Sequence, residues 1–318
     1  MNTNPLIPYL SGEMLSQLDL STTDVIESIE ALISNCENND AWSAPKAVIM
    51  PGDGRYMMAA LAAANDPPFL AVKTVILNPL NSEKNLPQIN GLVTMLDSES
   101  GLPVAILDGN WITAVRTAGL SAVAARRMAR PDSRVVAFIG CGVQAKSHLK
   151  AFADLFPLEE VRVFGRGQTN IDSLCELAET MSLTTKRCST GKEAIRDADL
   201  IVSSVTYRPS LVPFLDATLL KPGAFASVTD LGAPWMQEKL TAFDQVVIDD
   251  LAQEAALPNK IAPPELVTGD LSGLVLGRFS GRNSKDDRNA FIFRGHALGD
   301  LALSALALQK SREVTAVT

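Results

Sequence analysis

Residues 135–152, VVAFIGCGVQAKSHLKAF, constrain the fold of this chain more than any other stretch. A short apolar run predicts a buried strand, and a helical pattern follows after a tight turn that contains glycine. The turn has the spacing G-x-G-x-x-A, in which glycines let the backbone approach a pyrophosphate at a helix N-terminus. The spacing alone is a weak signal, but a second strand follows at 161–164, as in a βαβ unit. The cofactor-binding positions that this turn predicts are Gly140, Gly142, Val143, Gln144 and Ala145.

Strand and helix patterns alternate after this turn and indicate the fold class. The strand patterns RVVAFIG, EVRVFG, ADLIVSSV, GAFASV and QVVIDD are separated by helical stretches, which predicts a parallel sheet with crossover helices. The residues before 110 are typical of a mixed α+β unit, with short strand-like pieces at 45–71 and a strand in VKTVILNPLN. We further expect a capped helix at 21–35, a hairpin at 91–107, and helices rich in small residues at 113–129 and 299–309.

The end of the second strand, FGRGQTN, indicates which dinucleotide the turn would bind. An acidic residue there would hold the ribose 2′-hydroxyl of NAD, whereas this chain has Arg166. With no carboxylate to repel it, a 2′-phosphate can bind to the Arg166 guanidinium, with Gln168 and Thr169 as further donors. The alternative is that Arg166 points to solvent. We therefore predict NADP(H) in preference to NAD(H). Further predicted cofactor contacts, where ADLIVSSV ends, are Val205 and Thr206.

The composition of the 318 residues argues against several classes of function. A net charge of −8 without a basic cluster disfavours nucleic acid as a partner, because phosphate backbones bind Lys- and Arg-rich surfaces. Four cysteines without CxxC spacing and two histidines disfavour a zinc site, and we expect no metal. We see no signal peptide, and no apolar run approaches the ~20 residues of a membrane helix. We therefore expect no membrane partner and a cytoplasmic protein.

Taken together, these segments resemble the ornithine cyclodeaminase/mu-crystallin family over nearly the whole chain. The resemblance rests on VKTVILNPLN, TMLDSESGLPVAILDGNWITAVRTAGLSAVAARRMAR, IGCGVQA, GRFSGRNSKDD and GHALGDLALSAL. It implies an α/β fold in which a Rossmann dinucleotide-binding domain, residues 118–295, is inserted in an α+β domain. The latter, residues 1–117 plus 296–318, would bind the substrate and form a homodimer. The family includes ornithine cyclodeaminases, alanine dehydrogenases and NAD(P)H-dependent ketimine reductases, and some members are ligand binders or lens proteins.

The resemblance also implies which side chains bind the substrate. The carboxylate-binding positions of the family fall on Lys46, Lys73 and Arg116, and Lys46 replaces the arginine that is usual there. Such cations would hold the carboxylate of an imino or amino acid by charge-assisted hydrogen bonds, and Lys73 would also deliver a proton if burial lowers its pKa. Without the resemblance, Arg116 is typical of a charge on a helix surface, and Lys73 of a charge at a strand edge.

One departure from the family bears on the reaction. Cyclodeaminases carry an acidic residue two positions before the proline of a GSDxPGKxEL-like run. Here the run is TDLGAPWMQEKL, with Gly232 at that position and Asp230 two residues earlier. Reduction of a ready-made imine needs an anchored carboxylate, a proton source and a hydride, but not that acid. We therefore predict an NAD(P)H-dependent oxidoreductase that reduces small α-imino acids, above all Δ1-pyrroline-2-carboxylate or Δ1-piperideine-2-carboxylate.

Other functions and residues stay open at this point. Asp230 reaching in from a shifted backbone would allow ornithine cyclodeamination, dehydrogenation of a linear amino acid such as alanine is a near neighbour, and a cofactor-loaded binding protein is the third alternative. His296, where relatives carry an apolar residue, is either a polar contact to substrate or a histidine satisfied by neighbouring backbone. Arg294 raises the same question, and Asp300 is either catalytic or stabilised by a helix dipole. The catalytic set that we predict is Lys73, Arg116 and Asp230, and the substrate-binding set is Lys46, Lys73, Arg116 and His296. Apolar candidates for the substrate pocket are Met57, Met58, Trp111 and Trp235.

Overall fold

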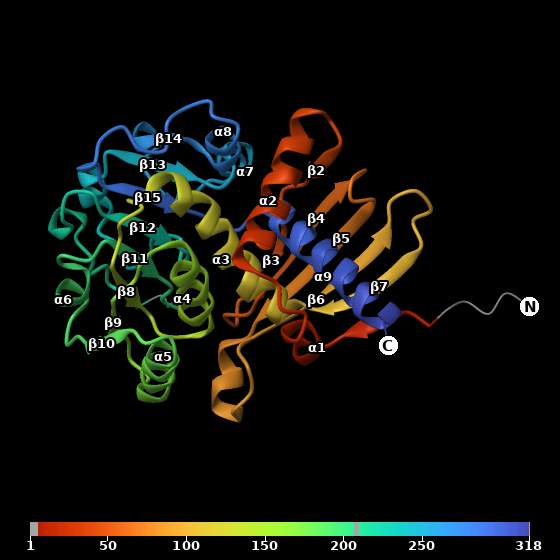
Figure 1. Ribbon diagram of the computed structural model, residues 1–318, viewed down its shortest axis with the longest axis horizontal. Helices are drawn as coiled ribbons and strands as arrows, with labels where there is room; N and C mark the ends of the chain where they lie inside the picture. The colour runs from red at the N-terminus through yellow and green to blue at the C-terminus, as the bar shows by residue number, and fades with distance from the viewer. Residues whose placement is uncertain (1–5, 207–209, 318) are drawn as a thin grey trace, which may run out of the picture. The chain divides into compact units, whose positions relative to one another are not determined.

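The computed structural model describes residues 6–206 and 210–317, and the chain divides into two compact units (Figure 1). Unit 1 comprises Met1–Arg116 together with Ala297–Thr318, and unit 2 comprises Thr117–His296. The first five residues, which belong to the N-terminal stretch searched for a signal peptide, lie outside the described part. No helix of the described residues has the length and apolar character needed to cross a membrane.

Unit 1 is built on a seven-stranded sheet in which the strands follow the order β1-β7-β6-β5-β4-β2, and β3 pairs with β4. The strands are β1 (Tyr9–Leu10), β2 (Ala41–Ser43), β3 (Ala47–Ile49), β4 (Tyr56–Ala64), β5 (Phe69–Leu77), β6 (Ile89–Asp97) and β7 (Pro103–Asp108). All pairs are antiparallel except β1 with β7. Strands β6 and β7 confirm the predicted hairpin, and β5 confirms the strand predicted in VKTVILNPLN.

Strand β4 differs from the expectation of short pieces in this region. It is a continuous strand of nine residues, YMMAALAAA, although alanine and methionine have little intrinsic preference for strands. It pairs with β5 over eight residue pairs and with β2 and β3 on its other edge. Pairing on both edges therefore overrides the weak local preference.

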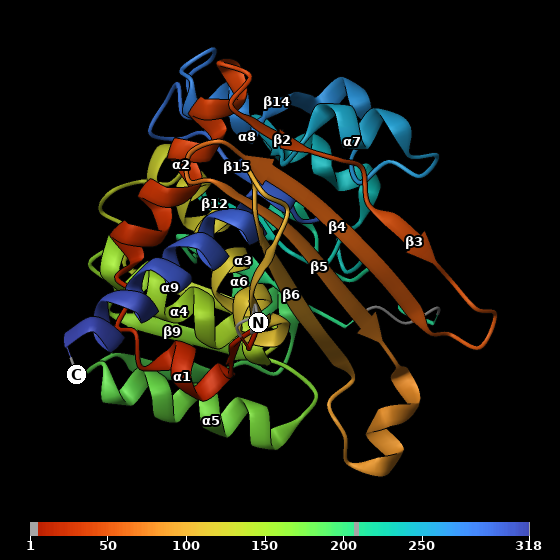
Figure 2. The ribbon, with the colours of Figure 1, turned by 90° about the vertical axis from the view of Figure 1, so that its right-hand side faces the viewer.

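Side chains of this sheet alternate between a covered and an uncovered face. On the covered face, Lys73 of β5 lies directly between Ala60 of β4 and Val93 of β6, and all three are buried. Helix α9 (Ala297–Val317) packs on β4 and β5, and α2 (Thr22–Glu37) packs on α9 and β2 (Figure 2). The uncovered face is also apolar, which leaves large side chains partly exposed to solvent. Its half-exposed members are Met57, Leu61 and Leu92.

One helix of unit 1, α2, begins at its predicted cap. Ser21 caps α2 in a capping box with Asp24, which confirms the predicted helix at 21–35. Helix α9 begins before the predicted range 299–309 and continues well beyond it. The remaining helices of this unit are α1 (Gly12–Ser16) and the 3₁₀ helix η1 (Pro79–Lys84).

Unit 2 is an eight-stranded parallel sheet with the order β10-β9-β8-β11-β12-β15-β13-β14. The strands are β8 (Val135–Ile139), β9 (Glu160–Phe164), β10 (Thr184–Arg187), β11 (Leu200–Ser203), β12 (Phe225–Val228), β13 (Gln245–Ile248), β14 (Val267–Asp270) and β15 (Asn289–Ile292). The five strand patterns from the sequence correspond to β8, β9, β11, β12 and β13, so the α/β Rossmann fold class is confirmed. Strand order reverses between β8 and β11, the place where such sheets bind ligands beyond their carboxyl ends.

Three strands of unit 2, β10, β14 and β15, were not among the strand patterns predicted from the sequence. Strand β15 comes last in the sequence but lies between β12 and β13, so its position depends on pairing over more than 40 residues. The helices are α3 (Gly109–Met128), α4 (Val143–Leu155), α5 (Gln168–Thr180), α6 (Gly191–Ile195), α7 (Leu251–Ala256), α8 (Leu271–Val275) and the 3₁₀ helices η2 (Ala217–Leu219), η3 (Gln237–Ala242) and η4 (Pro264–Leu266). Helix α3 starts four residues before the predicted Thr113, because Asp108 accepts a hydrogen bond from Trp111 N at 2.8 Å and caps it.

The core of unit 2 also includes one residue that the sequence suggested for the substrate pocket. Trp235 is 1% exposed and lies among buried strand residues such as Ile201 and Val246. Its indole N–H donates to Ser203 Oγ at 3.0 Å. Trp235 is therefore a core residue, and the suggestion that it lines a substrate pocket is wrong.

Candidate functional site

The glycine turn between β8 and α4 has the geometry of a phosphate-binding loop. Gly140 has φ +94°, and a Cβ there would lie 2.6 Å from Ser204 O, so only glycine fits. Gly142 is the N-cap of α4, and no side chain of the described residues caps this helix. No heavy atom lies within 4 Å of the place where a Cβ of Gly142 would be. The first N–H groups of α4 are therefore accessible to an anion.

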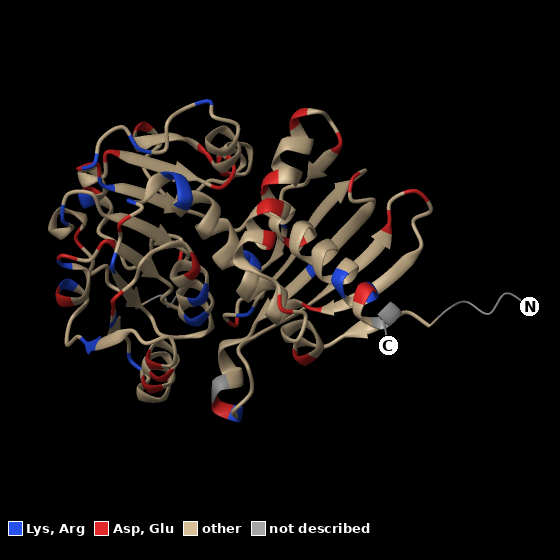
Figure 3. Cartoon of the chain, viewed as in Figure 1, with Lys and Arg blue, Asp and Glu red and all other residues tan. Residues whose placement is uncertain are grey.

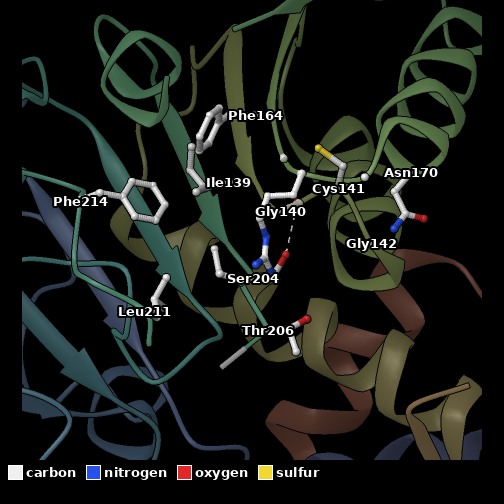
Figure 4. Close-up of a pocket in the computed structure, with 14 residues that line it drawn as sticks. Ile139, Gly140, Cys141, Gly142, Phe164, Asn170, Ser204, Thr206, Leu211 and Phe214 are labelled. Carbon is white, nitrogen blue, oxygen red and sulfur yellow. Dashed lines mark hydrogen bonds between the residues drawn. The ribbon is translucent and has the colours of Figure 1, made fainter. Parts of the chain in front are cut away.

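A pocket of about 260 Å³ lies beside this turn, at the carboxyl ends of β8, β9 and β11 (Figure 4). Of the predicted cofactor contacts, those that line it are Gly140, Gly142, Arg166, Val205 and Thr206. Val143, Gln144, Ala145 and Thr169 are not among its lining residues, whereas Asn170, in the first turn of α5, is. Ala145 is fully buried, as expected for the small residue where helix packs on strand.

Of the side chains predicted to bind the 2′-phosphate, Arg166 lines the pocket, whereas the Gln168 amide already donates a hydrogen bond within the protein. Arg166 lies between Gly165 and Gly167, the N-cap of α5, and lines the pocket. Gln168 Nε2 donates to Asp172 Oδ1 at 2.8 Å, so this amide is engaged within its own helix. Arg166 and Asn170 therefore line the pocket with polar side chains on the β9–α5 side.

Asp230 lies at the same carboxyl edge, just after β12, but is turned toward β11. Its Oδ1 accepts from Ser203 Oγ at 3.1 Å and its Oδ2 from Val205 N at 3.0 Å. The carboxyl is buried, and burial raises its pKa to about 6, against the opposing effect of these hydrogen bonds. Gly232, at the position where cyclodeaminases carry an acid, follows in a loop with φ +72°.

These features of unit 2 fit a pyridine dinucleotide. A glycine cradle, an uncapped helix N-terminus and the switch point of a parallel sheet coincide at one pocket. Arg166, two residues after β9, lines this pocket. The described residues contain no group of three or more His, Cys, Asp or Glu side chains suited to a metal ion.

The second part of the candidate site is a cluster of buried charges within unit 1. Lys73 Nζ lies 2.6 Å from Asp300 Oδ1, and Arg116 Nε lies 3.0 Å from the same oxygen. The side chains of Lys73, Asp300 and Arg116 are 1%, 4% and 6% exposed, respectively. The strands of unit 1 carry few charges away from their ends (Figure 3), so charged groups inside its core need a specific reason.

The fold explains how these charges meet. Lys73 points to the covered face of the sheet, and α9 packs on this face with Asp300 in its first turn. Arg116 comes from α3, which begins directly after β7, the neighbour of β6. The cluster therefore depends on three segments that are far apart in the sequence.

Mutual interactions set the protonation of the cluster. Burial and the adjacent Arg116 lower the pKa of Lys73 to about 7, although Asp300 opposes this shift. Burial alone would raise the pKa of Asp300, but Arg116 and Lys73 outweigh it and hold that pKa below its ordinary value. Lys46 also lowers both pKa values, so it contributes positive potential to the cluster. Asp300 is therefore ionised, and Lys73 exchanges a proton near neutral pH.

Arg116 has donor capacity that the protein does not use. Its Nη1 is buried, and no acceptor among the described residues forms a hydrogen bond with it. Leaving such a donor buried and unpaired costs about 1–3 kcal/mol, more for a charged group. A carboxylate of a bound ligand would supply the acceptor and complete a bidentate pair.

Comparison with known proteins identifies the family of this chain. A sequence profile described as Ornithine cyclodeaminase/mu-crystallin family matches residues 13–313. The chain belongs to this family. It is 30% identical to ketimine reductase mu-crystallin of Mus musculus over 256 residues, which are 78% of this chain and 79% of the relative.

Two further proteins to which the chain is similar are both named Δ1-pyrroline-2-carboxylate reductase. The Δ1-pyrroline-2-carboxylate reductase of Bacillus cereus is 26% identical over 77% of this chain and 78% of its own length. The structure of Thermococcus litoralis Δ1-pyrroline-2-carboxylate reductase in complex with NADH and L-proline superimposes with a TM-score of 0.87 at 24% identity, covering 97% of this chain and 98% of that one. At this identity the structural match establishes the fold.

The remaining predicted residues have other partners in this family member. Arg294 Nε pairs with Glu254 Oε2 at 2.7 Å, so this arginine is engaged within unit 2. His296 Nε2 lies 3.9 Å from Asp250 Oδ2, also within unit 2, and its side chain is 6% exposed. Met57 lies on the uncovered face of the sheet in unit 1. The sequence patterns raised Asp300 only as an alternative, and its place in the closing motif GHALGD was the signal for it.

Proposed function

We propose that the protein is an NAD(P)H-dependent oxidoreductase that reduces small α-imino acids, with the cyclic ketimines Δ1-pyrroline-2-carboxylate and Δ1-piperideine-2-carboxylate as substrates and proline and pipecolate as products. Relatives named ketimine reductase and Δ1-pyrroline-2-carboxylate reductase support a reaction at a C=N bond. The observation that carries the proposal is the buried Lys73–Asp300–Arg116 cluster with its unpaired Arg116 Nη1.

The cluster suits a substrate with one carboxylate. Arg116 offers Nη1 to an anionic oxygen, and Lys46 adds positive potential. Asp300 balances part of the positive charge and holds Arg116 Nε, which leaves the outer edge of the guanidinium to the ligand. In the proposal, the carboxylate of the imino acid therefore binds to Arg116, with Lys46 and Lys73 beside it.

The protonation of Lys73 suits the second requirement of imine reduction. A bound nicotinamide cofactor supplies the hydride for the imine carbon. The nitrogen needs a proton, and an acid with a pKa near the working pH donates and regains it efficiently. Lys73, whose pKa burial lowers to about 7, is the group that we assign to this role.

The region of Asp230 favours reduction over cyclodeamination. The position of the cyclodeaminase acid is occupied by Gly232, and both oxygens of Asp230 already accept hydrogen bonds from Ser203 and Val205. An acid tied in this way is poorly suited to protonate an amine during ring closure and ammonia loss. We therefore rank cyclodeamination of ornithine second.

We further propose NADP(H) as the preferred cofactor and a homodimer as the working form. Arg166 lines the pocket at the end of the second strand, where NAD-binding sheets carry an acid. The uncovered face of the unit 1 sheet leaves Met57, Leu61 and Leu92 between 44% and 46% exposed. An apolar sheet face of this kind is typical of a surface that a second subunit covers.

The deciding experiment follows absorbance of NADPH, and in parallel NADH, with each cyclic ketimine from about pH 5 to about pH 8. Imine-dependent oxidation is expected, and it should be lost in Arg116→Ala while nucleotide binding persists. Absence of oxidation with every ketimine at every pH would exclude the proposal. Ammonia release from ornithine without net NADH formation would select the cyclodeaminase, and net NADH formation from alanine would select the dehydrogenase.

A further inference from the structure

We propose that Asp230 is a positioning residue of the nucleotide site, which holds the Ser204–Thr206 wall of the pocket through the backbone N–H of Val205. The proposal rests on the binding of a dinucleotide at this edge. It differs from a catalytic assignment of Asp230, because the carboxylate acts on the protein backbone and not on a reacting atom.

The β11 ladder ends where this wall begins. Ser203 is the last residue of β11 and pairs with β8 and β12. The next residue is still held by β8, because Ser204 N donates to Ile139 O at 2.8 Å. Val205 is the first residue beyond the ladder, and its N–H donates to a side chain, Asp230 Oδ2, at 3.0 Å. The carboxylate thus takes the place of a strand partner at the edge of the pocket.

A directed chain of hydrogen bonds holds the carboxylate. The indole N–H of Trp235 can only donate, and it donates to Ser203 Oγ at 3.0 Å. The hydroxyl of Ser203 in turn donates a hydrogen bond to Asp230 Oδ1 at 3.1 Å. Trp235 and Ser203 are fully buried and Asp230 is 8% exposed, so water does not readily replace these bonds. These hydrogen bonds therefore require that both side-chain oxygens of residue 230 act as acceptors, which only an ionised carboxylate provides.

The Ser204–Thr206 wall, which Asp230 holds, is in direct contact with the glycine turn. The carbonyl oxygen of Ser204 leaves room only for the glycine at position 140, and Ser204 Oγ donates to Gly140 O at 3.4 Å (Figure 4). Ser204, Val205 and Thr206 all line the pocket together with this turn. A displacement of Val205 would therefore change the space for the nucleotide as well as the turn that cradles it.

If Asp230 must be ionised to hold the wall, nucleotide affinity should depend on pH. It faces the hydroxyl of Ser203 and the backbone N–H groups of Val205 and Gly232, and burial raises its pKa to about 6. Among the groups after the neighbouring strand β15, Arg294 pairs with Glu254, and His296 Nε2 lies 3.9 Å from Asp250 Oδ2. Protonation adds a donor where Val205 and Ser203 need acceptors, so nucleotide affinity should fall as the pH falls below about 6.

The test compares Asp230→Asn with Thr229→Val. The asparagine keeps the shape of the side chain but accepts on one atom instead of two. Thr229 Oγ1 donates to Ser203 O at 3.0 Å at the same strand end, outside the chain that leads to Val205, so its valine variant is a matched control for local damage. Binding of NADPH and NADH to the apoprotein is measured by nicotinamide fluorescence, with thermal unfolding in parallel.

We expect Asp230→Asn to raise the Kd of the nucleotide about tenfold or more, consistent with the loss of a hydrogen bond to a charged group. The kcat at saturating nucleotide and the KM for the imine should change less than about twofold. Thr229→Val should bind nucleotide as the wild type does. In the wild type and Thr229→Val, affinity for NADH, which lacks the titrating 2′-phosphate, should fall below about pH 6, and in Asp230→Asn this dependence should be absent.

An unchanged nucleotide Kd in Asp230→Asn would overturn the proposal, as would a large loss of kcat at saturating nucleotide. If the variant fails to fold, a wild-type affinity that is constant between about pH 5 and about pH 7 would overturn it instead. Nucleotide binding without turnover of any imine would refute the proposed function. The nucleotide Kd values of the variants would then still decide the role of Asp230. Failure of the wild type to bind either nucleotide would refute both.

Discussion

Lys73 and Asp300 are 227 positions apart in the chain, and their Nζ and Oδ1 atoms lie 2.6 Å apart inside unit 1. Arg116 shares the same carboxylate oxygen. Two cations on one buried anion leave positive charge in excess, which an incoming carboxylate can neutralise. This relationship links the stability of unit 1 to the chemistry that we propose for it.

Arg116→Lys should raise the KM for a cyclic ketimine by roughly 30- to 100-fold, because lysine cannot form a bidentate pair with a carboxylate. Steady-state kinetics at saturating NADPH measures this effect. Arg126→Lys, an exposed position in the last turn of the same helix, is the matched control and should leave KM unchanged. Equal KM values for the wild type and Arg116→Lys would argue against carboxylate binding by Arg116.

The pH dependence of kcat/KM should report Lys73. Because burial and Arg116 lower its pKa to about 7, the protonated donor is lost as the pH rises through that value. The rate of imine reduction should therefore fall on the alkaline side of about pH 7, and Lys73→Met should lose most of the activity and show no such limb. A wild-type profile that stays level up to about pH 9 would refute Lys73 as the proton donor.

Asp300→Asn should destabilise the protein by about 3–5 kcal/mol, because it leaves the buried Arg116 cation, and Lys73 where it is protonated, without a counter-ion. Urea unfolding at neutral pH measures this change. The double variant Lys73→Met/Asp300→Leu removes a cation together with the anion and should recover part of the loss. A double variant no more stable than Asp300→Asn would show that the cluster is not the origin of the effect.

The lowered pKa of Lys73 also predicts a slope of stability with pH. The unfolded chain, where the pKa is near the ordinary 10.5, binds this proton more tightly than the folded chain. The contribution of Lys73 is therefore present above pH 10.5 and is lost as the pH falls through about 7. Between these values the free energy of unfolding should rise with pH in the wild type more steeply than in Lys73→Met. Equal slopes in the two proteins would contradict the lowered pKa.

Arg166→Gln should weaken NADPH binding by roughly tenfold and leave NADH binding nearly unchanged, since only NADPH carries the 2′-phosphate. Fluorescence titration of both nucleotides gives the ratio. Arg134→Gln, at an exposed arginine that pairs with Glu159 ahead of β8 and β9, is the control and should preserve the wild-type ratio. An equal loss of affinity for NADPH and NADH in Arg166→Gln would exclude a specific role of Arg166 in binding the 2′-phosphate.

The sequence predicted much of the fold because its signals are local. The strand, glycine turn and helix at 135–155, the five strand patterns of unit 2 and the capped α2 are readable from short stretches and are present in the structure. Strand β15 and the length of β4 were not predictable in this way. Their positions depend on pairing with distant strands, which no local pattern records.

For the candidate site, the sequence by itself pointed to individual residues but not to their partners. Motif resemblance singled out Lys73 and Arg116, while their shared counter-ion Asp300 ranked as an alternative and Asp230 as a catalytic acid. Only the tertiary structure brought Asp300 to both cations and tied Asp230 to the backbone of Val205. The physical reason is that glycines and caps act through their own backbone, whereas a charge acquires its role from burial and from neighbours that only folding supplies.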